Sequence, residues 1–300
     1  MQCFQAERTI NVTIKATTLA LPILALGTSA LAQGIEYQSF GAGYSNLSTG
    51  GSDGSLFSLG GGLDYRSGGF VFNGSTGYLD LEDDITLTAL DMRAGYFIVP
   101  QAAVYVGLDY IDVEGFDLTI YNIGGEYQFG PGAVGINLSE PDVSGAETIT
   151  TVYGGYSVMP QLEMSLAITE VDGETGATFA SDFDLGGSEF AATYMTSDGI
   201  DIFAVNGNYD LGNNFRVGGG YADFDGDVDL VSVSGGYEMR NDMWLDVSYG
   251  QASFSGGPDI DVLGFALSFE TGRESLLVDR ASTAQADALG VLGDVFAPMR

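Results

Sequence analysis

The segment Gly95-Tyr96-Phe97-Ile98-Val99-Pro100-Gln101 states a pattern that recurs along the chain: an extended run ends in a tyrosine and an apolar residue, and a tight turn follows. Further copies, the last one looser, lie at 126–132, 155–161, 236–242, 209–214 and 65–69. Successive tyrosines of the pattern lie 31, 31, 29 and 28 residues apart, in the pairs Tyr65 and Tyr96, Tyr96 and Tyr127, Tyr127 and Tyr156, and Tyr209 and Tyr237. Regular hairpins of this length, each with an aromatic residue at one end, are typical of an antiparallel β-barrel that crosses a membrane.

The first 32 residues have the features of a signal peptide. Arg8 and Lys15 precede an apolar run at 19–26, and Ala30-Leu31-Ala32 supplies the small-x-small cleavage pattern. The apolar run is too short to anchor the chain in a membrane. Because the only cysteine, Cys3, lies in this segment, we expect an exported mature chain without disulfides.

The mature chain is strongly acidic. Of 9 Lys and Arg residues and 41 Asp and Glu residues, removal of 1–32 takes away Arg8, Lys15 and Glu7, which leaves 7 basic and 40 acidic side chains and no lysine. This balance argues against nucleic acid as a partner and favours cations.

Apolar residues occupy every second position of the expected strands. In the last strand, one face carries Leu263, Phe265, Leu267 and Phe269, and the other carries Gly264, Ala266 and Ser268. One apolar face and one small or polar face fit a barrel with lipid outside and water inside. A soluble β-sandwich would show the same alternation.

The positions of the aromatic residues favour the barrel. One expected ring lies at the ends of descending strands: Tyr65, Tyr96, Tyr127, Tyr156, Tyr209, Tyr237 and Phe269. A second ring lies at the far ends of ascending strands: Tyr44, Tyr78, Tyr110, Tyr194, Tyr221 and Tyr249. Two such rings are the aromatic girdles of an outer-membrane barrel.

Tracing the alternation predicts an all-β fold, a transmembrane antiparallel β-barrel over 33–270 with short loops and about 16 strands. The expected strands are 35–47, 55–66, 70–81, 85–98, 102–112, 116–129, 132–140, 147–158, 162–171, 176–184, 188–196, 200–210, 214–223, 228–239, 243–254 and 260–270. Fourteen strands stay open as an alternative because the pattern is weak over 172–200. Residues 271–300 break the alternation and are expected to form a periplasmic tail, helical or disordered.

The Pro turns at 100, 131 and 160 are expected to face the periplasm, whereas the opposite connections are acidic, which would place many acids at the outer mouth. By alternation, ten charged residues should line the pore: Asp64, Asp91, Arg93, Asp109, Glu126, Glu163, Glu189, Arg216, Glu238 and Asp246. Such charges would be costly in a solid barrel, so they indicate a wet lumen. Two interpretations of Arg93 and Arg216 stay open: they oppose acids across the pore, or they pair with acids nearby. Trp244 also points inward, unlike a girdle residue.

Several kinds of chemistry are excluded. The chain has no histidine and the mature chain no cysteine, so catalytic or metal sites that depend on them are absent. The acidic run at 223–229 suggests a weak calcium site formed by Asp223, Asp225, Asp227 and Asp229, although its spacing differs from that of a helix-loop-helix calcium loop. We expect that the protein is not an enzyme and that it binds no cofactor, apart from weakly bound divalent cations.

Over 33–270 the chain resembles the Gram-negative outer-membrane porins, above all the alphaproteobacterial type, in its signal peptide, its acidic cysteine-free composition and its Tyr-ended strands with turns such as Gln128-Phe129-Gly130-Pro131-Gly132. The resemblance implies a trimeric or monomeric passive channel for small hydrophilic solutes in the outer membrane. Two departures are evident. The connection at 112–116 is too short for the long third loop that constricts classical porins, and Phe269 is followed by a tail.

The expected function is a porin that admits small cationic or neutral solutes with a preference for cations. Outer-membrane lipid is the expected partner, and a homotrimer is left open. One alternative is a structural or adhesive barrel without an open pore, and another is a secreted acidic β-rich calcium-binding protein.

Overall fold

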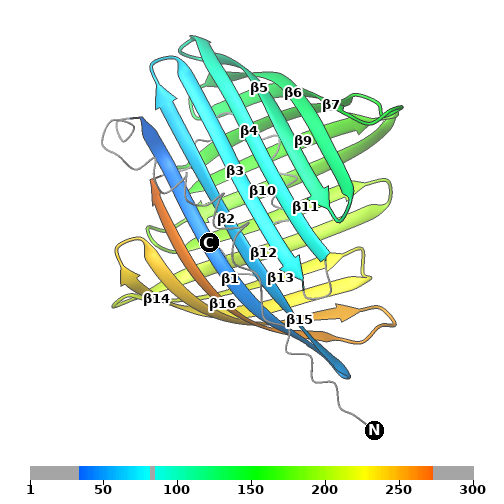
Figure 1. Cartoon of the computed structure of the whole chain (residues 1–300). Coiled ribbons are helices and arrows are strands. Elements are labelled where there is room, and N and C mark those ends of the chain that lie inside the picture. Colours follow the sequence, from blue (N-terminus) through cyan, green and yellow to red (C-terminus); the bar gives the residue numbers. More distant parts are fainter. Residues whose placement is uncertain (1–33, 82–84, 273–300) are drawn as a thin grey trace. The chain divides into compact units, whose positions relative to one another are not determined.

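Sixteen strands follow one another along residues 34–81 and 85–272, the part of the chain that the computed structural model describes (Figure 1). Their bounds are β1 Ile35–Thr49, β2 Ser52–Ser67, β3 Phe70–Leu81, β4 Ile85–Val99, β5 Ala102–Val113, β6 Phe116–Phe129, β7 Gly132–Pro141, β8 Ile149–Met159, β9 Leu162–Val171, β10 Glu174–Asp184, β11 Glu189–Ser197, β12 Ile200–Gly212, β13 Phe215–Phe224, β14 Val228–Arg240, β15 Met243–Phe254 and β16 Ile260–Gly272. Among these residues there is no helix that is long and apolar enough to cross a membrane.

The sheet is closed, which confirms the expected antiparallel barrel. Each strand pairs with its neighbours in sequence, and β1 pairs with β16 from Tyr37 opposite Gly272 to Thr49 opposite Ile260. Closure satisfies the backbone hydrogen bonds that a free edge strand would leave unpaired.

The alternative of fourteen strands is wrong. In the segment where the pattern is weak, β10 and β11 are both continuous strands, paired from Gly176 opposite Ser197 to Asp184 opposite Glu189. The alternation is blurred because polar residues such as Ser181 and Thr196 lie on their outer faces and apolar residues such as Ala180 and Met195 on their inner faces. The strand β16 runs to Gly272 and so includes the first two positions of the expected tail. The rest of that tail, and the expected signal peptide, lie outside the described residues.

The two ends of the barrel differ in their turns. We call the proximal rim the end at which β1 begins and β16 ends; its connections are 68–69, 100–101, 130–131, 160–161, 185–188, 213–214 and 241–242. The distal rim carries 50–51, 114–115, 142–148, 172–173, 198–199, 225–227 and 255–259. The longest of these described connections is 142–148, and the β5–β6 connection is only Glu114 and Gly115. No described connection is therefore long enough to fold across the lumen.

Four two-residue turns have positive φ at both positions: Glu114 (39°) and Gly115 (86°), Asp172 (52°) and Gly173 (79°), Asp198 (46°) and Gly199 (82°), and Asn213 (55°) and Asn214 (67°). Such turns match the twist of the strands that they join. Asp and Asn tolerate this backbone conformation better than other residues with a side chain. Turn geometry therefore accounts for part of the acidity of the distal rim.

We predict that Asn213→Val destabilises the barrel by about 1–2 kcal/mol, because a β-branched side chain is disfavoured at positive φ. Urea unfolding in lipid vesicles would measure the change in the free energy of unfolding. The control is Asn213→Gly, which accepts this backbone conformation and is expected to stay close to the wild type. Equal destabilisation in both variants would contradict the assignment of the cost to backbone conformation.

Candidate functional site

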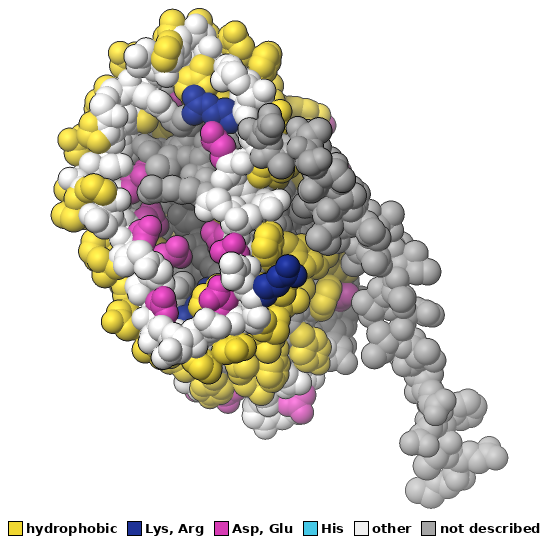
Figure 2. Space-filling view, turned by 90° about the vertical axis from the view of Figure 1, so that its left-hand side faces the viewer, with side chains coloured by type: hydrophobic (Ala, Val, Ile, Leu, Met, Phe, Trp, Pro, Cys, Tyr) yellow, Lys and Arg dark blue, Asp and Glu magenta, His cyan; other side chains and the backbone are white. Residues whose placement is uncertain are grey.

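The inner and outer faces of the barrel have opposite chemistry. Large apolar residues on alternate strand positions are exposed outward, among them Val104, Ile123 and Val233, whereas the intervening positions carry polar, charged or small residues. Figure 2 shows hydrophobic side chains around the outside of one mouth and acidic side chains along its inner border. The candidate site is therefore the inner wall.

All ten charged residues predicted to line the pore lie on the inner face, by the strand alternation. They differ in exposure, however: Asp64, Arg93, Glu126 and Asp246 are buried against the wall, Asp91, Asp109, Glu163, Arg216 and Glu238 are half-buried, and Glu189 is exposed. Only the more exposed members can meet solutes in the lumen directly.

Arg93 on β4 pairs with two acids beside it. Its guanidinium lies 2.8 Å from the Asp91 carboxylate and 3.3 Å from that of Asp109, and only 2% of its side chain is exposed. A hydrogen-bonded row continues across the next strands, since Asn122 donates to Asp109 at 2.8 Å and Asn137 donates to Asn122 at 3.1 Å. Arg93 therefore pairs locally, and its charge is neutralised within the wall.

Arg216 on β13 is held in the same way. Its Nε donates to Asp246 Oδ1 at 2.9 Å and its Nη2 to Oδ2 at 2.7 Å, a bidentate pair that spans β14. The guanidinium also lies 4.2 Å from the ring centroid of Trp244, which explains why this aromatic residue points inward. Of the two interpretations left open by the sequence, local pairing holds for both arginines.

The large inner side chains lie over glycines of the neighbouring strand. A Cβ at Gly107 would lie 2.9 Å from Arg93 Cγ, and one at Gly236 would lie 2.9 Å from Arg216 Nε. Likewise, a Cβ at Gly124 would overlap the Tyr105 ring. These side chains rest in recesses of the wall, which sequence reasoning missed; the glycines on polar faces were the available signal.

An acidic sector lies on the inner face of β9–β12 near the proximal rim; it consists of Glu163, Asp182, Asp184, Glu189 and Asp210. Its members on neighbouring strands stand directly opposite one another, Asp182 against Glu163 and Asp184 against Glu189. Like charges so placed repel and destabilise a sheet. Asp182, Asp184, Glu189 and Asp210 are exposed. Of these five, sequence reasoning singled out only Glu163 and Glu189.

The residues predicted to form the two aromatic rings lie on the outer face at the expected ends. Tyr65, Tyr78, Tyr110 and Phe269 are half-buried there, and the other nine are exposed. At the proximal rim two of the tyrosines contact phenylalanines of the adjacent strand, Tyr96 with Phe70 at 4.8 Å and Tyr237 with Phe215 at 5.1 Å between ring centroids.

Five of the six tyrosines of the distal ring donate hydrogen bonds to aspartates of the outer face. The pairs are Tyr78 with Asp80 at 3.2 Å, Tyr110 with Asp112 at 3.1 Å, Tyr194 with Asp201 at 3.1 Å, Tyr221 with Asp229 at 2.7 Å and Tyr249 with Asp261 at 2.7 Å. These five acids therefore lie outside the wall. Three of them, Asp112, Asp229 and Asp261, belong to the acidic connections expected at the outer mouth, and they point away from the lumen.

Three of the four residues of the suggested calcium site have separate roles. Asp229 accepts from Tyr221 on the outer face, and Asp223 accepts from the backbone N–H of Gly226 at 3.2 Å in the turn. Asp225 adopts a positive φ of 56° in the same turn. Within 34–81 and 85–272 no group of three or more acidic, cysteine or histidine side chains is placed to hold a metal ion.

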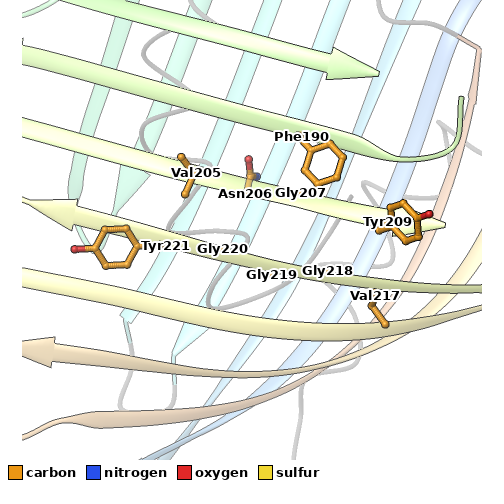
Figure 3. Close-up of a pocket in the computed structure, with 10 residues that line it drawn as sticks. All are labelled: Phe190, Val205, Asn206, Gly207, Tyr209, Val217, Gly218, Gly219, Gly220 and Tyr221. Carbon is orange, nitrogen blue, oxygen red and sulfur yellow. The ribbon is translucent and has the colours of Figure 1, made fainter. Parts of the chain in front are cut away.

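One shallow pocket lies in the wall at β11–β13 (Figure 3). Gly207 and Gly219 stand opposite each other at its floor, and the outward side chains of Phe190, Val205 and Tyr221 contribute to its lining. No charged side chain takes part. Because the pocket opens on the apolar outer face, it is not part of the inner-wall site.

Comparisons with known proteins address the fold. No family model matches the chain, and no curated protein matches it. Three mutant forms of the porin of Rhodopseudomonas blastica are among the similar solved structures, with TM-scores of 0.51, 0.50 and 0.50 and sequence identities of 13%, 14% and 14%. They cover 78%, 79% and 78% of this chain and 100% of their own. The expected resemblance to an alphaproteobacterial porin is confirmed in the architecture: the chain has the closed sixteen-stranded barrel fold of bacterial outer-membrane porins.

Proposed function

We propose that the protein is a porin of the bacterial outer membrane, a passive channel for small hydrophilic solutes. The observation that carries this proposal is the division of a closed barrel into an apolar outer face with aromatic ends and a polar inner face. Lipid solvates the first and water the second in barrels of this kind. The porin fold of the solved structures supports the same assignment.

An open pore is favoured over an occluded structural barrel by the inner wall. No described connection is long enough to cross the lumen. Arg93, Arg216 and Tyr105 would be long enough to reach toward the axis, but each lies along the wall over a glycine. The mechanism is diffusion limited by size and charge, with no covalent step.

The acidic sector supports a preference for cations. The sequence has no Lys or Arg between Arg93 and Arg216, so β5–β12 carry no basic side chain. The acids beside the two arginines are ion-paired, whereas Asp182, Asp184 and Glu189 are exposed on the inner face of strands without a basic residue. Fixed negative charge in a pore raises the local concentration of cations and lowers that of anions.

The first prediction from this proposal is stepwise conductance. Purified full-length protein added to a planar bilayer in KCl should produce discrete current steps, because a water-filled lumen passes hydrated ions. Heat-modifiable gel mobility would confirm that the added protein is a folded barrel. Folded protein without steps would refute the open channel and favour the structural barrel.

The second prediction concerns ion selectivity. Under a KCl gradient the wild type should show a reversal potential whose sign indicates a preference for cations. The triple variant Asp182→Asn, Asp184→Asn and Glu189→Gln should shift it toward zero, since three charges leave the inner wall. The shift should be larger at low salt, where screening is weaker.

A matched control removes three charges from the outer face through Asp112→Asn, Asp229→Asn and Asp261→Asn. Asparagine keeps an acceptor for the tyrosine hydroxyls, and the reversal potential should stay at the wild-type value. Equal shifts in both triple variants would argue against the acidic sector as the source of selectivity.

A further inference from the structure

Two tyrosines on the inner wall face each other across the two strands β6 and β7. Tyr105 on β5 stands directly opposite Gly124 on β6, and Tyr153 on β8 stands directly opposite Gly135 on β7. Each ring leans over its glycine, and the two hydroxyl oxygens meet at 3.2 Å. The pair thus joins the hairpins β5–β6 and β7–β8 through β5 and β8, which are not neighbours in the sheet.

Both rings are buried against the inner surface of the wall. Only 2% of Tyr105 and 3% of Tyr153 is exposed, although their strand positions point to the lumen. A Cβ built at Gly124 would overlap Cζ and Oη of Tyr105, and one at Gly135 would overlap the same two atoms of Tyr153. The rings therefore occupy the volume that a side chain at either glycine would need.

A ring displaced from its recess has one direction in which to move. The sheet is a single layer, so the backbone of β6 and β7 blocks movement outward. Along the wall, Tyr105 packs in a buried cluster with Val71, Phe97 and Ala103, and the buried Glu126 lies beside the pair on β6. The direction that these neighbours leave is toward the lumen.

We propose that Gly124 and Gly135 set the free cross-section of the channel by keeping the Tyr105–Tyr153 pair in the wall. This inference rests on the proposed porin function. It assigns a size-determining role to the wall itself, in a barrel whose described connections are too short to form a constriction. The two glycines act through the tyrosines and are therefore positioning residues.

The experiment compares single-channel conductance and the size cut-off for polyethylene glycols in the wild type, Gly124→Ala and Gly135→Ala. Both variants should conduct less and exclude smaller polymers, because a ring then projects into the lumen. The matched control is Gly77→Ala on the inner face of β3, where a Cβ would meet nothing within 4 Å. It adds the same methyl group without displacing a ring and should keep wild-type values.

Removal of the displaced ring provides the test of mechanism. The double variant Gly135→Ala with Tyr153→Ala should regain at least the wild-type conductance, because the three atoms nearest to a Cβ at Gly135 all belong to Tyr153. A general loss of stability would not produce this rescue. Conductance of Gly124→Ala equal to that of Gly77→Ala would overturn the inference while the porin function stands. A wild type that never conducts would refute the porin function itself.

A second measurement needs no change at a glycine, in case those variants fail to fold. Tyr105→Ala alone should keep the wild-type polymer cut-off, because a ring that already lies in the wall does not obstruct the pore. A larger cut-off in Tyr105→Ala would show that the native ring narrows the lumen and would overturn the inference.

Discussion

A closed sheet of one layer is the constraint on which the rest of this structure depends. Such a sheet has no second layer to pack against, so there is no shared hydrophobic core, and each residue faces either the outside or the lumen. Small apolar clusters do form on the inner face, such as Ala204, Ala222, Leu230 and Ala252 on β12–β15. They cover part of the wall only. Backbone hydrogen bonds between strands, completed by the pairing of β1 with β16, must hold the barrel.

This constraint explains how the large side chains of the inner face are packed. A large residue that points inward has no opposing layer to contact, so it gains packing only by lying on its own wall. Glycines on the adjacent strand make room for it, as Gly107 does for Arg93 and Gly236 does for Arg216. Charge is handled in the same local way, since both arginines are bonded to acids one or two strands away. The acidic sector differs because β5–β12 contain no basic residue.

Much of the architecture could be predicted from the sequence, because a two-residue period and paired tyrosines are local signals. The strands around Tyr96, Tyr127 and Tyr156 show this most clearly. The alternation of positions along a strand also predicts whether a charged residue faces inward or outward. Alternation cannot predict contacts between strands, such as the pairing of Arg93 with nearby acids instead of acids across the lumen, or the position of Tyr105 over Gly124. Those outcomes depend on register and side-chain direction.

The acids of the distal rim show the same limit. Their clustering in sequence suggested one electrostatic role, but strand parity and turn geometry divide them. Asp112 and Asp261 lie outside the wall beneath tyrosine hydroxyls, while Asp172 and Asp198 have positive φ in tight turns. A count of acidic residues near a mouth therefore overstates the charge that a solute in the lumen encounters.

The short turns have a consequence for how the barrel assembles. Every strand pairing except one joins segments adjacent in sequence, so most contacts close small loops at little entropic cost. The exception is the β1–β16 seam, which brings together residues as far apart as Tyr37 and Gly272. The long-range part of the contact order is concentrated in this single event, and topologies that depend on distant pairing fold slowly. A hairpin series can thus form progressively, whereas the seam completes the cylinder only when both of its ends are in place.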